Sequence, residues 1–399
     1  MQLSFRSGDA LRRLALSFFN LTLFISGFLV SGYSYAVLMP APPQLAASSY
    51  LLVDADSGTV IVEHNADQQL PPASLTKIMT SYIVSAELHK GNVNFSDNVP
   101  VSVKAWKMGG SRMFIKEGTD VLLEDLLRGV IVQSGNDASV ALAEYIAGDE
   151  ATFAAMMNQQ AFSLGMLNTH FVNATGWPAE GHVSTARDLS LLANALINDF
   201  PEHYAIYSEK EFTYNDITQP NRNGLLWRDQ NVDGIKTGHT EEAGYCLVSS
   251  AKRDEMRLIT VVMGTKSSRS REQETQKLLS YGFRYYQTFA LYDAGQAVEQ
   301  TRVWGGAEKQ FELALEEPLI VTIPRGEKDN LEAVMEIDQE LVAPIRQGEV
   351  YGELKLSLNG ETLAKRKLVA KHDVEPAGII ARLIDWLVLF VRGLLGLVS

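Results

Sequence analysis

The chain has 399 residues, of which 46% are hydrophobic, and a formal net charge of −13. This composition is typical of a globular protein long enough for two domains. The acidic charge disfavours nonspecific binding to nucleic acid, and the sequence has none of the basic helices or zinc-ligand spacings that nucleic-acid-binding modules use.

The first 36 residues have the features of a secretory signal peptide. Arg12 and Arg13 precede an apolar run over residues 14–30, and Ser34-Tyr35-Ala36 has the small-x-small pattern of a cleavage site. These residues carry a net charge of +2, so the rest of the chain carries −15. The sequence predicts export with cleavage after Ala36, and the alternative is an uncleaved anchor, because the run is long for a signal core.

Residues 37–285 are expected to form the first domain. Strands are predicted at residues 50–54 and 59–62, joined by the turn residues 54–58 into a hairpin. Apolar spacing then predicts helices over residues 121–132, 138–146, 151–164 and 186–197, the last with Thr185 and Asp188 as its capping pair. Strands follow at 245–249 and 258–263, and a helix at 272–283. Strands at both ends that enclose a helical insert predict an α+β domain whose terminal strands share one sheet.

The single cysteine, Cys246, lies within one of these predicted strands. A lone cysteine has no intramolecular disulfide partner, so the fold must depend on a buried core. We therefore expect Cys246 to be a small core residue.

Residues 286–372 are expected to form a small all-β domain. Short strands are predicted at 311–313, 319–323, 333–337, 350–357 and 362–369, and Asn359-Gly360 predicts a tight hairpin.

The last segment, residues 375–399, is predicted to be an amphipathic helix. Arg382, Asp385 and Arg392 interrupt its apolar residues and fall within about 80° of one another on a helical wheel. Three charges argue against a membrane span, and the one-sided polar stripe favours a helix that lies in the membrane interface. The alternative is a helix docked on the protein's own core.

The stretch Pro71-Pro72-Ala73-Ser74-Leu75-Thr76-Lys77 contains the first candidate site residues. The prolines favour an extended approach followed by the start of a helix, on which Ser74 and Lys77 share one face. A serine beside a buried lysine of lowered pKa suits a nucleophile with its own base. Because S-x-x-K is a common pattern, the alternative is a capping serine with a solvated lysine.

Two further motifs with candidate site residues follow the Ser74 motif along the chain. Ser134-Gly135-Asn136 lies between two predicted helices, where a loop would present a hydroxyl and a carboxamide. Residues 236–240 (KTGHT) stand at the start of the strand region, where Gly238 would allow a substrate backbone to approach a sheet edge. S-x-x-K, an S-D-N-like motif and K-T-G together are typical of β-lactamases and penicillin-binding proteins.

With these motifs the sequence resembles the low-molecular-mass penicillin-binding proteins, specifically the D-alanyl-D-alanine carboxypeptidases of the penicillin-binding protein five and six type. The blocks that carry the resemblance are residues 73–77, 109–114, 134–138, 221–226 and 232–240. It covers the whole mature chain, and implies a β-lactamase/transpeptidase-like domain, a small β-rich domain and an amphipathic tail.

The resemblance implies a role for each matching residue. Ser74 would be the nucleophile, Lys77 its base and Ser134 the proton donor to the leaving D-alanine. The remaining matching residues are implied to bind the substrate: Asn136 orients its amide and helps to hold Lys77, Gly238 lies at the sheet edge, His239 acts through its main chain in the oxyanion hole, and Lys236, Thr237 and Arg271 bind its carboxylate.

The implied function is removal of the terminal D-alanine from peptidoglycan pentapeptide stems, with β-lactams as covalent inhibitors, no cofactor and no metal. The chain would act at the periplasmic face of the cytoplasmic membrane, anchored by its C-terminal helix. No E-x-x-L-N stretch is present, so efficient β-lactam hydrolysis is not expected. The alternatives are a DD-endopeptidase and a non-catalytic scaffold that binds peptidoglycan or β-lactams.

Overall fold

The computed structural model describes residues 39–338 and 340–394. The predicted signal peptide and its cleavage site lie outside these residues.

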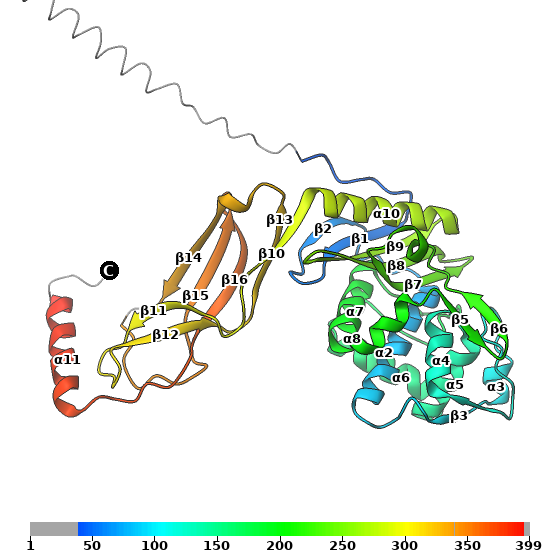
Figure 1. The fold of residues 1–399 in the computed structure, drawn as a ribbon, viewed down its shortest axis with the longest axis horizontal. Coiled ribbons are helices and arrows are strands. Elements are labelled where there is room, and N and C mark those ends of the chain that lie inside the picture. The colour runs from blue at the N-terminus through cyan, green and yellow to red at the C-terminus, as the bar shows by residue number, and fades with distance from the viewer. Residues whose placement is uncertain (1–38, 339, 395–399) are drawn as a thin grey trace, which may run out of the picture. The chain divides into compact units, whose positions relative to one another are not determined.

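The first part of the chain is built on a five-stranded antiparallel sheet with the order β2-β1-β9-β8-β7 (Figure 1). Its strands are β1 (Ser49–Asp54), β2 (Val60–His64), β7 (Val232–Thr240), β8 (Gly244–Arg253) and β9 (Met256–Thr265). β1 pairs with β9, so strands from the two ends of this part share one sheet, as the sequence predicts. The expected fold class is confirmed.

Helices cover both faces of this sheet. The apolar side chains of each strand are divided between the two faces of the sheet, because successive residues of a strand point to opposite faces. In β1, Leu52 packs with Leu278 and Leu279 of α10 (Ser268–Tyr285), whereas Leu51 belongs to the larger apolar cluster of the helical insert. α10 therefore covers one face, and α2 (Lys77–His89) and α7 (Ala186–Asp199) cover the other (Figure 1).

The helical insert contains the predicted helices with shifted ends. Its other helices are α3 (Val103–Trp106), α4 (Leu123–Ile131), α5 (Asn136–Ala147), α6 (Glu150–Ser163), α8 (Pro201–Tyr204) and α9 (Leu225–Arg228). The prediction of one helix over 121–132 is wrong at its start, because Val121 pairs with Val99 in a short ladder of β3 (Asn98–Pro100) and β4 (Asp120–Leu122). The expected cap of α7 is confirmed, since Thr185 Oγ1 accepts a hydrogen bond from the Asp188 N–H.

Several strands were not predicted individually. They include the hairpin of β5 (Glu211–Tyr214) and β6 (Ile217–Pro220), and β10 (Tyr286–Tyr292) and β11 (Ala297–Arg302) in the C-terminal part. β5, β6 and β11 contain no buried residue, so they lack the apolar alternation that marks a strand with one face in the core.

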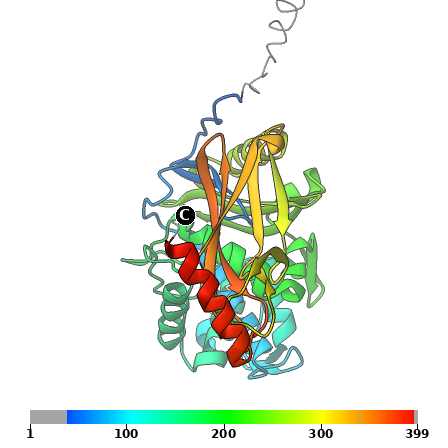
Figure 2. The same cartoon turned by 90° about the vertical axis from the view of Figure 1, so that its left-hand side faces the viewer.

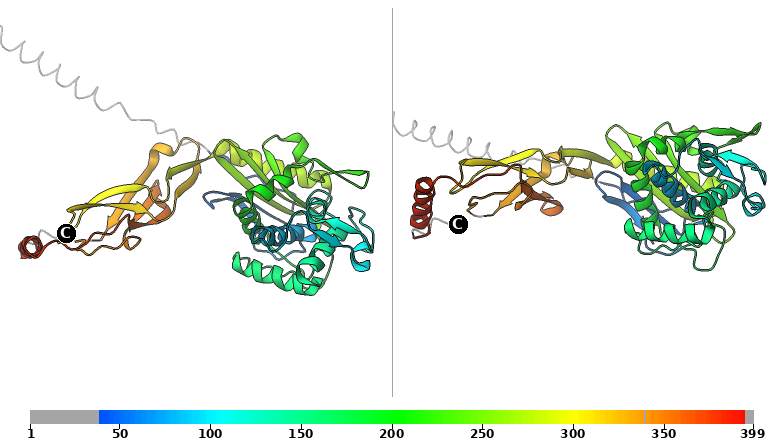
Figure 3. Two further views of the ribbon diagram at one scale, coloured as in Figure 1. Left: turned by 60° about the horizontal axis from the view of Figure 1, so that its bottom comes forward. Right: turned by 90° about the horizontal axis from the view of Figure 1, so that it is seen from below.

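The second part is rich in strands (Figure 3). Its five-stranded sheet has the order β11-β12-β16-β15-β14, and β10 pairs with β13. The further strands are β12 (Gln310–Leu315), β13 (Leu319–Pro324), β14 (Leu331–Ile337), β15 (Val350–Leu358) and β16 (Glu361–Ala370). The predicted hairpin at Asn359-Gly360 joins β15 to β16, with both residues at positive φ.

The chain's last described element is helix α11 (Ile379–Leu394), drawn red in Figure 2. Its Asp385 is buried and accepts hydrogen bonds from the Gly305 N–H at 2.8 Å and from Lys309 Nζ at 2.9 Å. The polar stripe predicted for this helix therefore contacts the β-rich part of the chain, and most of the helix's apolar side chains are exposed. No helix among the described residues is long and apolar enough to cross a bilayer.

Candidate active site

Ser74 lies where an extended segment turns into helix. A 3₁₀ helix over Ala73–Thr76 leads directly into α2, so Ser74 and Lys77 lie one turn apart, as their spacing predicts. Lys77 Nζ donates a hydrogen bond to Ser74 Oγ at 3.2 Å. Ala73, just before the serine, has a φ of 49°, and such left-handed geometry in a non-glycine residue is concentrated at functional sites.

Lys77 is almost completely buried and surrounded by acceptors. Besides Ser74, its Nζ donates to Asn136 Oδ1 at 2.7 Å and to the Thr175 carbonyl at 2.5 Å. Burial, and next the positive charge of Arg222, lower the pKa of Lys77 to about 7. In a large share of the molecules, therefore, the Lys77 amine is neutral near pH 7. A neutral amine can accept a proton from the serine hydroxyl.

The 134–137 segment brings the second motif to the same place. Ser134 is buried with a φ of 59°, and Asn136 begins α5. Asn136 Oδ1 accepts from Lys77, and its Nδ2 donates to the Gly109 carbonyl at 2.7 Å. The next residue, Asp137, accepts backbone hydrogen bonds from residues 113, 114 and 115, so one short segment holds both the lysine and the 109–115 loop.

The third motif lies on β7, the edge strand of the main sheet. Lys236 is buried, and its pKa is lowered well below the usual value, first by burial and then by the charges of Lys77, Arg222 and Arg271. Gly238 faces the serine segment closely, since a Cβ atom there would lie 3.0 Å from the Pro72 carbonyl oxygen. A side chain at this position would therefore require the strand and the Ser74 segment to move apart by a few tenths of an ångström.

Arg271 projects from the first turns of α10 toward this strand. Its Nη1 donates to the Gly238 carbonyl at 3.3 Å, and its Nε is buried with no hydrogen-bond partner among the described residues. Arg269, two residues earlier in the chain, does not line the cleft, whereas Arg271 does.

These segments enclose one cleft of about 890 Å³. Its walls include seven of the predicted site residues: Ser74, Ser134, Asn136, Thr237, Gly238, His239 and Arg271. Lys77 is joined to this group by its hydrogen bonds to Ser74 and Asn136. Lys236 does not line the cleft, but its Nζ donates to the Thr237 carbonyl at 3.2 Å and the charges of Lys77 and Arg271 act on it, so it lies beside the cleft.

The cleft also contains residues to which sequence reasoning assigned no role. Arg222 lies on the wall, and its charge lowers the pKa of both Lys77 and Lys236. Arg222 falls within residues 221–226, one of the blocks that carry the family resemblance, and this block was the sequence feature that could have identified it as a site residue. Tyr245, whose ring stacks on His239 at 3.9 Å, and Trp177 have no motif that could have identified them.

Comparison with known proteins agrees with this geometry. A family model described as D-alanyl-D-alanine carboxypeptidase matches residues 36–267, and one described as the C-terminal domain of penicillin-binding protein 5 matches residues 286–376. The D-alanyl-D-alanine carboxypeptidase DacA of Escherichia coli (strain K12) is 41% identical over 389 residues, which is 96% of each chain. DacC of the same strain is 45% identical over 355 residues, covering 87% of this chain and 89% of DacC. The crystal structure of penicillin-binding protein 5 from Haemophilus influenzae superposes with a TM-score of 0.82 at 43% identity, covering 84% of this chain and 99% of that one.

The fold and the relatives together define a serine hydrolase of the penicillin-binding class. The chain belongs to the D-alanyl-D-alanine carboxypeptidase family. The predicted resemblance and the predicted carboxypeptidase activity are confirmed.

Proposed function

We propose that Ser74 is the nucleophile of this carboxypeptidase and that Lys77 is its base. Ser74 Oγ attacks the carbonyl carbon between the two terminal D-alanines while its proton passes to neutral Lys77. Ser134 then gives its proton to the amine of the departing D-alanine and receives in return the proton held by Lys77, so that an acyl-enzyme ester and a neutral Lys77 remain. Water hydrolyses this ester with Lys77 again as the base. The observation that carries the proposal is the contact between Lys77 Nζ and Ser74 Oγ at a buried amine whose pKa is about 7.

The other predicted site residues bind the substrate in this proposal. Lys236, Thr237 and Arg271 hold the terminal carboxylate, since cations with a hydroxyl favour an anionic group. The N–H groups of Ser74 and His239 stabilise the oxyanion, a contribution worth about 3–4 kcal/mol per donor in a comparable hydrolase. Gly238 leaves room at the strand edge. Asn136 Nδ2 carries two N–H donors: one donates to the Gly109 carbonyl, and the other is proposed to orient the substrate amide.

We propose pentapeptide stems of peptidoglycan as the substrate and β-lactams as covalent inhibitors of Ser74. Penicillin-binding protein D2 of Listeria monocytogenes, a relative at 31% identity and a TM-score of 0.57, has been solved in an ampicillin-bound form. A β-lactam presents a reactive amide carbonyl near a carboxylate, the same pair of groups that the cleft is proposed to bind. Cleavage of cross-linked peptides is the competing activity, and a monomeric pentapeptide and a cross-linked dimer separate the two.

The Ser74→Ala variant is expected to lose D-alanine release and covalent penicillin labelling while remaining folded. Ser74 is the only residue proposed to form the ester, and alanine fits the helix start without new contacts. Intact-mass spectrometry after incubation with penicillin measures the adduct, and D-alanine release from a pentapeptide measures turnover. The Ser81→Ala variant, also on α2, is the control and keeps both signals. A penicillin adduct of normal yield on Ser74→Ala would show that another residue is the nucleophile.

We also propose that the chain is exported and that α11 binds the membrane surface from outside the cytoplasm. The signal-like residues 1–36 support export. Binding is supported by the way α11 is held: Asp385 anchors the polar stripe, and Arg302 and Arg392 lie over the Trp304 ring at 3.8 and 5.3 Å from its centroid. Large apolar side chains of the helix are left exposed, among them Ile380, Leu383, Trp386, Leu387 and Phe390.

Removing residues 379–399 is expected to abolish binding to lipid vesicles and leave penicillin labelling of Ser74 intact. The full chain should float with vesicles of phosphatidylethanolamine and phosphatidylglycerol, because burying the exposed apolar side chains supplies the free energy. Leu383→Glu with Leu387→Glu should weaken binding as well, whereas Glu361→Gln, far from α11 in sequence, should not. Vesicle binding by the truncated chain would refute the proposed anchor.

We further propose that the chain divides as predicted, with a catalytic domain over 37–285, a β-rich domain over 286–372 and the tail helix in 375–399. Separate apolar clusters support this division: two lie within residues 45–286 and a third lies within residues 289–374.

A further inference from the structure

A second cavity, of about 490 Å³, adjoins the Ser74 cleft. It lies within the size range of ligand pockets, roughly 300–1,000 Å³. Both cavities are lined by Gly176, Trp177, Pro178 and Thr240, so these four residues form the border between them. The walls of the second cavity also come from residues 71–73, just before the serine, and from residues 179–183. We call this second cavity the side groove.

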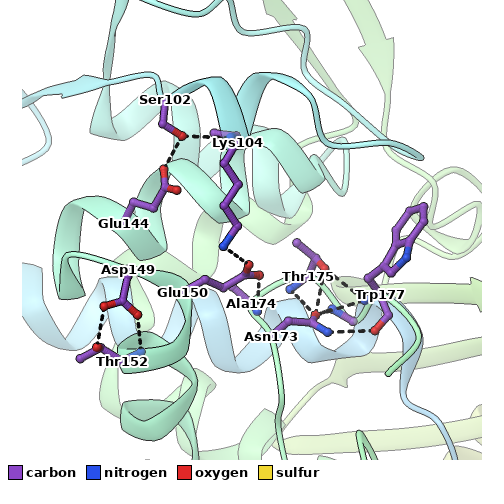
Figure 4. Close-up of polar contacts among 12 residues, drawn as sticks. Ser102, Lys104, Glu144, Asp149, Glu150, Thr152, Asn173, Ala174, Thr175 and Trp177 are labelled. Carbon is purple, nitrogen blue, oxygen red and sulfur yellow. Dashed lines mark hydrogen bonds and ion pairs between the residues drawn. The ribbon is translucent and has the colours of Figure 1, made fainter. Parts of the chain in front are cut away.

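The border between the cleft and the side groove includes a turn that is closed by hydrogen bonds of Asn173, and Figure 4 shows these bonds. Asn173 Oδ1 accepts hydrogen bonds from the backbone N–H groups of Thr175, Gly176 and Trp177 at 2.8–3.2 Å. Its Nδ2 donates to the Trp177 carbonyl at 2.9 Å, so one side chain closes the turn from both ends. The same turn presents the Thr175 carbonyl to Lys77. The position of Trp177 is therefore tied to that of the lysine.

This turn packs closely against residues 71–73, just before Ser74. Gly176 has a φ of +79°, and a Cβ atom there would lie 1.8 Å from the Ala73 carbonyl oxygen. The Trp177 ring also lies against Gly109 and Gly110, since a Cβ atom added to these glycines would lie 3.5 and 3.2 Å from its nearest ring atom. The ring is thus packed at one side and yet 49% exposed overall.

An indole held in this way is suited to binding. Tryptophan offers a large rigid apolar surface with little conformational entropy to lose, which is why it is enriched at binding hot spots. Figure 4 shows its ring extending away from the Asn173 turn. Nothing in the proposed chemistry at Ser74 uses this ring.

The orientation of the substrate follows from the proposed function, on which this inference rests. The terminal carboxylate lies at Lys236, Thr237 and Arg271, and the reacting carbonyl lies at Ser74 and His239. Along β7 the direction from Lys236 to His239 leads next to Thr240, one of the border residues. The part of the peptide that precedes the two D-alanines must therefore leave the cleft past Thr240 and Trp177.

We propose that the side groove is a binding subsite for the peptide residue that precedes the two D-alanines, with Trp177 as its contact surface. Glu180 and Glu242 line the groove, and neither has an ion-pair partner among residues 39–338 and 340–394. The groove therefore favours a residue that carries an amino group over one whose amine is acylated. This makes the enzyme sensitive to the length and the charge of its substrate beyond the D-alanyl-D-alanine end.

The test compares a short and a longer substrate. Acetyl-D-Ala-D-Ala ends before the side groove, whereas acetyl-Lys-D-Ala-D-Ala places one residue with a free amine in it. We expect Trp177→Ala to lower the ratio of kcat/KM for the longer over the shorter peptide about ten-fold, and Trp177→Phe to restore part of that ratio. The matched control is Trp227→Ala, because Trp227 is 48% exposed and lines neither cavity. An unchanged ratio in Trp177→Ala would overturn the proposal.

A second arm tests the charge preference. Wild-type enzyme should prefer acetyl-Lys-D-Ala-D-Ala to its Nε-acetyl form, and the Glu180→Gln, Glu242→Gln double variant should lose that preference. A preference that persists in the double variant would overturn the assignment of the amine to the groove. Failure of the proposed function is distinguishable, because it would abolish D-alanine release from both peptides and penicillin labelling of Ser74.

Discussion

Replacing Lys77 with alanine is expected to slow the acylation of Ser74 by about 10²–10⁴-fold, the usual contribution of a positioned general base. Without the amine, Ser74 Oγ loses its contact with a group whose pKa is about 7. The rate of penicillin adduct formation, followed by mass spectrometry over time, measures the effect. Lys90→Ala is the matched control, since Lys90 follows the end of the same helix and is exposed. An adduct formed at the wild-type rate by Lys77→Ala would rule out the lysine as the base.

The pH profile of the wild-type enzyme provides an independent check on the same residue. Only the neutral amine accepts the serine proton, so the acylation rate should rise with pH and level off above the pKa of about 7. An unperturbed lysine, with a pKa of 10.5, would keep the rate rising well beyond pH 9. A rate that falls as pH rises from 6 to 8 would contradict the assignment.

Replacing Asp137 with alanine is expected to destabilise the protein by about 3 kcal/mol or more. The Asp137 carboxylate is buried and accepts backbone hydrogen bonds from Met113, Phe114 and Ile115 at 2.9–3.3 Å. Each buried donor left without a partner costs roughly 1–3 kcal/mol. Chemical denaturation measures the change in the free energy of unfolding, and KM for the peptide should rise because Gly110 and Ser111 line the cleft.

Asp149→Ala is the control for the Asp137 prediction. Asp149 is exposed and caps α6 by accepting from the Thr152 N–H, and the loss of such a cap costs about 1 kcal/mol. Equal destabilisation by the two substitutions would show that the buried carboxylate does not hold the 109–115 loop. Hydrogen exchange at residues 113–115 locates the effect, since these amides should lose protection only in Asp137→Ala.

Much of the fold follows from local patterns. The hairpin of β1 and β2, the main helices and most strands of the β-rich part have apolar spacing that suits one element and no other. The predictions failed where that spacing is absent or misleading. Val121 continues the helical pattern of α4, yet it pairs with Val99 instead, because cross-strand partners are distant in sequence. The polar stripe of α11 is visible in the sequence, but its contact with Gly305 and Lys309 is not.

The sequence by itself determined the order and spacing of the three motifs, and with them the family and the candidate residues Ser74, Lys77, Ser134 and Lys236. Only the tertiary structure decided what surrounds the lysine: the Asn136 side chain, the Thr175 carbonyl and the charge of Arg222 come from three separate segments. The physical reason is that a pKa depends on burial and on nearby charges in space, and neither can be read from neighbours along the chain. The same holds for Trp177, which becomes a candidate binding residue only because the Asn173 turn places it at the border of two cavities.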